Sequence, residues 1–288
     1  MSNECEKDKQ DSCNNESSSS SAASLSGGAL TELASIVVKD PKFKKATHNI
    51  CHTAVTLTET FNNILLPFTA INSGIAKARK YFEEKFQSDL SEKLKAIPEK
   101  DLVEPKLYIA GPAVQGLALS HEDTCLKDMY LNLLKSSMDI KTTELAHPAF
   151  VEIIKQLTAY EAILLNGLLS DLEIEHAIVE YIKISKTDRS WTTISRHVMN
   201  LSTSEGEFIY IPYIESWVDN WSRLGLVDAD YSTRLVEDNA YDWVNQMDDF
   251  KNLISNFESE KYNISYREGV LRITGFGKSF SKAVGISQ

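Results

Sequence analysis

Apolar residues recur at spacings of three and four through much of residues 28–157, which is the pattern of amphipathic helices. One clear apolar face combines Leu57, Phe61, Ile64 and Phe68. Prolines interrupt the pattern, because the residue before a proline disfavours helical backbone. The helices predicted in this region are Gly28–Val38, Lys42–Leu66, Lys77–Ile97, Ala110–Leu119, Glu122–Ser137 and Pro148–Leu157.

Beyond residue 157 the pattern changes. Thr158 and Glu161 have the spacing of a capping box, which marks the start of a helix. Gly225 is placed to end a helix in a left-handed turn, and the segment from Gly275 to Gly277 is expected to be a turn. The expected elements are helices at Thr158–Leu169, Trp191–Leu201 and Tyr210–Leu224, a strand at Val270–Thr274, and a last helix at Lys278–Val284.

This order of elements is typical of a winged-helix domain, and the helical segment Asp242–Phe257 is expected to be an insertion in its wing. The predicted fold class is therefore mainly α. A helical domain at residues 28–157 is followed by a winged-helix-like α+β domain with a small β-hairpin at residues 158–288. Residues 1–27 are rich in serine and too polar to offset the entropy of ordering, which predicts a disordered tail.

The formal net charge of the 288 residues is −11, and residues 158–288 hold 20 acidic and 12 basic side chains, a balance of −8. Nucleic-acid affinity depends largely on neutralising phosphates with cations, so this charge disfavours a nucleic-acid partner. The four cysteines form no CxxC pair, and reduced thiols are expected. With no secretory signal and no apolar run long enough to span a bilayer, the expected location is the cytoplasm.

Aromatic residues form a stripe at Tyr213, Trp217 and Trp221, which repeat every four residues on one helix face. This stripe is either core packing or an interaction surface for a partner. The same helix carries Glu215 and Asp219, whereas a recognition helix in a DNA groove needs cations. The pattern therefore favours a protein partner or a structural role over DNA binding.

His147 precedes Pro148 at a predicted helix start, so these two residues mark a candidate functional loop. The imidazole could act as a base, or it could cap the helix. His48 and His52 share a helix face near Cys51, but no third metal ligand is evident. No phosphate-binding or dinucleotide-binding loop is present, so no catalytic residue, metal or cofactor is predicted.

Several short motifs resemble the Abi-alpha (abortive-infection alpha) family of bacteria and their mobile elements. They are Val103-Glu104-Pro105, Ala110-Gly111-Pro112-Ala113, Asn132-Leu133-Leu134, Met138-Asp139, the run HPAFVEIIKQL from His147, and Ile273-Thr274-Gly275-Phe276-Gly277-Lys278-Ser279-Phe280. Gly275 stands where the family pattern has proline. The resemblance implies a bacterial antiphage abortive-infection component, of a family whose molecular activity is not defined.

Three functional classes stay open. The first is a non-enzymatic protein that binds a protein partner or phage component, which agrees with the lack of a catalytic motif. The second is a membrane-perturbing effector using the amphipathic helix around Phe61–Phe68, with Lys77, Arg79 and Lys80 beside it for peripheral membrane contact. The third is an enzyme such as a nuclease, which requires carboxylates and a histidine to converge in a cleft. The oligomeric state is not predicted.

Overall fold

The computed structural model describes residues 73–202 and 208–287. The expected tail at residues 1–27, the histidines His48 and His52, and the amphipathic face at Phe61–Phe68 lie outside these residues.

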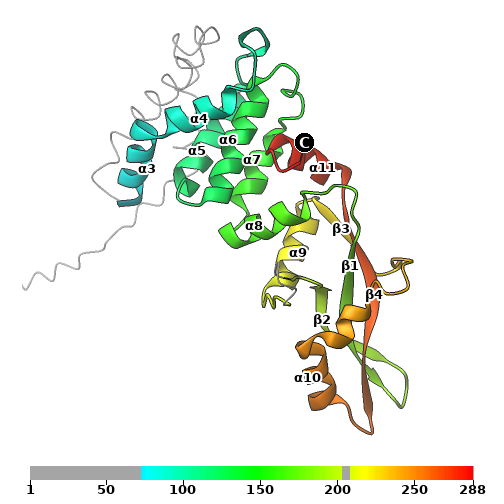
Figure 1. Ribbon diagram of the computed structural model, residues 1–288. Coiled ribbons are helices and arrows are strands. Elements are labelled where there is room, and N and C mark those ends of the chain that lie inside the picture. Colours follow the sequence, from blue (N-terminus) through cyan, green and yellow to red (C-terminus); the bar gives the residue numbers. More distant parts are fainter. Residues whose placement is uncertain (1–72, 203–207, 288) are drawn as a thin grey trace, which may run out of the picture.

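The first part of the described chain consists of helices, shown at the top of Figure 1. A short 3₁₀ helix, η3, at Glu99–Asp101 connects the second helix to the third. The expected helix Lys77–Ile97 is divided at Lys85, while the four helices expected at residues 110–119, 122–137, 148–157 and 158–169 are confirmed with small shifts of their ends. The six α-helices are α3 (Ser73–Glu84), α4 (Phe86–Leu94), α5 (Leu107–Ser120), α6 (Thr124–Met138), α7 (Pro148–Lys155) and α8 (Ala159–Leu168).

The second part of the chain is built on a four-stranded antiparallel sheet with the strand order β2-β1-β4-β3. Its strands are β1 (His176–Ser185), β2 (Trp191–Met199), β3 (Val227–Asp230) and β4 (Tyr262–Ile273). Helix α9 (Ile214–Arg223) connects β2 to β3, and α11 (Gly275–Ala283) ends the chain. The 3₁₀ helix η4 (Asp242–Gln246) and helix α10 (Asp248–Phe257) connect β3 to β4.

The sheet shows that the predicted mainly α, winged-helix fold is wrong, and the fold is mixed α+β. The expected helix Trp191–Leu201 is strand β2, and β1 was not predicted. Both strands are rich in β-branched residues, which fit a pleated surface once partner strands cover them. The expected strand Val270–Thr274 is the end of the twelve-residue β4.

The segments 242–257 and 275–277 both form helical structure, the first as expected and the second in place of an expected turn. The segment Asp242–Phe257 is helical as expected, but it joins two paired strands of the sheet. The expected turn at Gly275–Gly277 is instead the first turn of α11, because the Thr274 hydroxyl accepts a hydrogen bond from the Gly277 N–H and caps the helix.

The sheet is covered on both faces. One buried cluster runs from the helices α3–α8 through Ile178 of β1 to Trp221 of α9. A second cluster lies on the opposite face, where Val179 and Tyr181 of β1 pack under η4 and α10. Because successive side chains of a strand point to opposite faces, β1 is buried on both sides and forms the centre of the sheet.

The end of the chain returns to the helical part, where α11 lies beside α6 (Figure 1). Ser136 of α6 donates a hydrogen bond to the Ala283 carbonyl, and Asn132 donates one to the Val284 carbonyl. The buried cluster and these hydrogen bonds link the helices to the sheet, so the sheet packs against the helical part of the chain.

Candidate functional site

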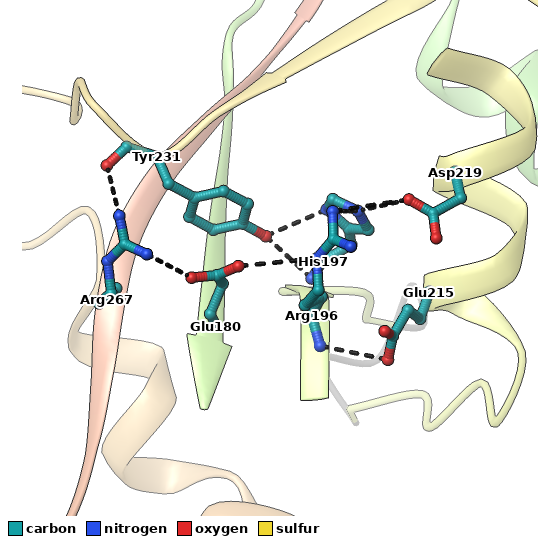
Figure 2. A network of polar contacts seen from close by, with 7 residues as sticks. All are labelled: Glu180, Arg196, His197, Glu215, Asp219, Tyr231 and Arg267. Carbon is teal, nitrogen blue, oxygen red and sulfur yellow. Dashed lines mark hydrogen bonds and ion pairs between the residues drawn. The ribbon is translucent and has the colours of Figure 1, made fainter. Parts of the chain in front are cut away.

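A cluster of polar side chains forms where β2 contains a β-bulge. Arg196 and His197 of β2 together lie opposite the single residue Glu180 of β1. The φ angle of His197 is 57°, in the left-handed region that residues other than glycine rarely adopt. A bulge redirects side chains relative to a regular strand. Both residues consequently lie between Glu180 and Asp219 of α9 (Figure 2).

Hydrogen bonds define the tautomer of His197. The Tyr231 hydroxyl accepts a bond from the His197 backbone N–H at 2.9 Å, so its own hydrogen is free to be donated to Nδ1 at 3.0 Å. The proton of the neutral ring is then on Nε2, which donates to Asp219 Oδ1 at 3.1 Å. Arg196 Nη2 lies 3.3 Å from Nε2, but both groups are donors, and they share the Asp219 carboxylate as their acceptor.

The pKa values agree with this assignment. Burial lowers the pKa of the His197 imidazole, Asp219 opposes that shift, and the Arg196 cation adds to it. Burial also raises the pKa of the Tyr231 phenol. At neutral pH the imidazole is therefore uncharged and the phenol protonated, which the hydrogen-bond pattern requires.

The buried carboxylate of Glu180 lies between two guanidinium groups. Arg267 Nη1 donates to it at 2.9 Å, and Arg196 Nε lies 3.6 Å from its other oxygen. The Arg267 guanidinium also stacks over the Trp191 ring at 4.8 Å. Burying a charge costs free energy unless the charge is paired and hydrogen-bonded. Glu180 is paired with two arginines and accepts a hydrogen bond from Arg267.

Tyr231 reaches the cluster because residue 269 is glycine. A Cβ atom on Gly269 would lie 2.5 Å from Cδ1 of the Tyr231 ring, which is far closer than carbon atoms approach. The phenol therefore crosses β4 at this glycine and reaches His197 on β2.

The cluster also fastens α9 to the edge of the sheet. Glu215 Oε2 accepts a hydrogen bond from the Arg196 backbone N–H at 3.3 Å, and Asp219, one turn later, accepts the bond from His197. Both acceptors lie on the same helix face, because residues four apart are neighbours. The position of α9 beside β2 is thus set by two side chains that bind two consecutive residues of the bulge.

A groove of about 330 Å³ lies beside the cluster and shares Glu215 with it. Its walls are β2, the segment before and at the start of α9, and one side of α10. The lining residues are Tyr181, Ile194, Ser195, Val198, Met199, Leu201, Ile209, Tyr210, Ile211, Pro212, Ile214, Glu215, Met247, Asp249, Asn252, Leu253 and Asn256. Most are apolar, a composition typical of binding sites.

The charges in the groove are acidic. Among its lining residues in the described chain, the charged ones are Glu215 and Asp249. Burial raises the pKa of the Asp249 carboxyl, and the neighbouring Asp248 raises it further. Within residues 73–202 and 208–287, no lysine or arginine pairs with Asp249.

The predicted aromatic stripe is not one surface. Tyr213 is 65% exposed and directly precedes α9, next to the groove. Trp217 is partly buried against the main core, and Trp221 is fully buried in it. Trp217 and Trp221 lie on one face of α9, and that face packs inward. Of the three residues, Tyr213 has its ring in solvent.

His147 and Pro148 lie at the start of α7, far along the chain from the cluster. The exposed His147 caps α7: its Nδ1 accepts a hydrogen bond from the Ala149 N–H at 3.1 Å. Its ring lies beside the rings of Phe150 and Phe276. Pro148 is the first helical residue, where its missing N–H has no cost.

Neither the cluster nor the groove was among the features predicted from the sequence. Glu215 and Asp219 were interpreted as evidence against DNA binding, but their partners Arg196 and His197 fall in the segment 191–201, which was expected to be a helix. The available signal was the β-branched character of β1 and β2, which would have put Glu180 and His197 on adjacent strands.

No group of three His, Cys, Asp or Glu side chains in the described residues is arranged to hold a metal ion. None of the helices within those same ranges combines the length and apolar character needed to cross a bilayer.

The role of the Tyr231 hydroxyl can be tested by Tyr231→Phe. This change leaves the His197 N–H and Nδ1 without their partner in a buried site, so the free energy of unfolding should fall by about 1–3 kcal/mol. Tyr210→Phe, on an exposed ring, is the matched control and should have little effect. Urea unfolding measures both, and equal stability of the two variants would contradict the role given to Tyr231.

The lowered pKa of His197 predicts a pH dependence of stability. Below the ordinary value of 6.5 the unfolded chain binds a proton that the folded chain resists, so stability is lost as the pH falls. Burial lowers the pKa of His176 too, so both histidines contribute in this direction. His197→Asn, which tolerates left-handed backbone, should show a smaller loss of stability between neutral and mildly acidic pH. The exposed His147→Asn should keep the full loss, and an unchanged loss in His197→Asn would refute this reading.

Comparison with known proteins identifies the family of the chain. A search of curated proteins finds none that matches. One solved structure, an uncharacterized protein from the hydrocarbon-degrading marine bacterium Alcanivorax borkumensis SK2, is similar at 20% identity with a TM-score of 0.32. That match covers 51% of this chain and 96% of the other. The model of the abortive infection alpha family matches residues 78–284, well over half of the chain, which confirms the resemblance seen in the sequence. The chain belongs to the abortive infection alpha family.

Proposed function

We propose that the protein is a bacterial antiphage abortive-infection component that acts in the cytoplasm by binding a partner, with the groove beside β2 as its binding site. Membership of the abortive infection alpha family supports the biological setting. The observation that carries the choice of site is the apolar groove between β2, the start of α9 and α10.

Exposed apolar side chains around the groove support a binding role. Phe208, Ile209, Tyr210 and Tyr213 are exposed on the segment that leads into α9, and Ile194 is exposed on β2. Contiguous exposed apolar surface is typical of interaction sites, and tyrosine is among the residues that contribute most to binding energy.

The polar cluster supports binding over catalysis at this place. His197 is 2% exposed, and its two ring nitrogens are engaged by Tyr231 and Asp219. A general base must reach the proton that it removes. The imidazole is instead positioned to hold α9 against β2. The role supported for the cluster is therefore to fix the position of the elements that line the groove.

A phage challenge of a bacterial host that expresses the protein tests this proposal. The double variant Ile209→Ala/Tyr210→Ala removes two exposed side chains from the groove. Protection should fall by about tenfold or more, because loss of a central aromatic contact commonly costs over ~1.4 kcal/mol of binding energy.

The matched control is Ile140→Ala/Tyr160→Ala, which removes the same residue types, also exposed, from the helical part of the chain. Its protection should equal that of the wild type at equal protein level. Full protection by the groove variant would refute the groove as the binding site. Loss of protection in His197→Asn together with full protection by the groove variant would instead favour catalysis.

A further inference from the structure

The outer edge of β2 is the feature of the groove that most restricts what can bind there. In the strand order of the sheet, β2 pairs with β1 and has no strand on its other side within the described residues. Free edges are usually protected by lysines, prolines, β-bulges or very short strands. The first half of β2, from Trp191 to Ser195, has no lysine or proline, and its pairing with β1 is irregular at Ile194. Trp191, Thr192 and Ile194 are exposed.

The groove lies next to this strand edge and offers side-chain contacts to a ligand bound there. Ile194 and Val198 of β2 lie on one side, and Leu253 of α10 lies on the other. An edge strand beside a helix is the arrangement in which extended peptides are bound, with main-chain hydrogen bonds along the edge and pockets for alternate side chains. The volume of about 330 Å³ suits a few side chains rather than a folded domain.

The acidic residues of the groove favour an occupant with positive charge. Glu215 already accepts a hydrogen bond from the Arg196 backbone, whereas Asp249 has no cationic partner in the described residues. A ligand with a cationic side chain would pair with Asp249 at this half-buried position. Phosphates and acidic segments would be repelled, and so would a second copy of this chain, whose net charge is −11.

We propose, on the basis of the function proposed above, that the groove binds an extended polypeptide segment, which pairs with the outer edge of β2 and places a lysine or arginine at Asp249 beside apolar side chains. The strand edge provides the main-chain contacts, and the walls of the groove select the sequence. The partner is thus a protein with an exposed, basic and apolar strand-forming segment.

Selection of peptides tests the chemistry of the occupant. An mRNA-displayed library of random peptides of about eight residues, a common strand length, is selected on the immobilised full chain and counter-selected on Ile209→Ala/Tyr210→Ala. The proposal predicts enrichment of peptides that combine Lys or Arg with β-branched or aromatic residues. Enrichment of acidic or proline-rich peptides, or no enrichment over the counter-selection, would overturn it.

Variants of two adjacent aspartates then test the charge contact with a selected peptide. Asp249→Asn should weaken binding by about tenfold, in the range measured for partly buried charge pairs. Asp248→Asn is the matched control, because its side chain is 92% exposed and lies outside the groove, and it should bind as the wild type does. Equal affinities of the two variants would overturn the role of Asp249.

Hydrogen exchange tests strand addition itself. A peptide that pairs with the edge should slow amide exchange in Trp191–Ser195, and a peptide that binds without slowing it would exclude strand pairing. If the groove variant loses phage protection while no basic peptide is selected, the proposed function stands and the peptide inference fails. If basic peptides bind as described while the groove variant keeps full protection, the proposed function fails instead.

Discussion

The arrangement of the second half of the protein depends on the buried carboxylate of Glu180, which two arginines pair, and on the bulge of β2 opposite to it. Glu180 lies at the centre of the sheet with a guanidinium on either side, from Arg267 and Arg196. The extra residue of the bulge turns His197 into the left-handed region and directs its ring toward α9. Removing either arginine would leave the buried Glu180 carboxylate with one cation instead of two, so the bulge that carries Arg196 and the ion pairs of Glu180 stabilise each other.

The groove is a consequence of this arrangement. Asp219 and Glu215 hold α9 against the bulge, so the chain between β2 and α9 is kept beside the strand edge. Helix α10 packs on the opposite face of the sheet and supplies the other wall. The buried network and the binding surface are therefore parts of one structure: the network is closed and internally paired, while the surface next to it is apolar, acidic and open.

The sequence predicts those features that local interactions determine. Thr158 and Glu161 form both halves of the expected capping box, and Gly225 adopts the expected positive φ. Most of the sheet was not predicted, because β2 forms only when β1 lies beside it, and this tertiary pairing outweighed the helical interpretation of its apolar positions. The β-branched residues of β1 and β2 could have placed Glu180 and His197 on adjacent strands. The contacts of His197 with Asp219 and Tyr231 depend on the register of the bulge, which the sequence pattern does not reveal. The burial of Trp221 likewise depends on which face of α9 meets the core.

Hydrogen exchange followed by mass spectrometry on the double variant Glu215→Gln/Asp219→Asn measures the link between cluster and groove most directly. If these two carboxylates hold α9 to the bulge, amide protection should be lost in β2, in the segment 209–213 and in α9, while protection in α5 and α6 stays at the wild-type level. Protection that is unchanged in β2 and α9, or lost uniformly through the chain, would contradict the account.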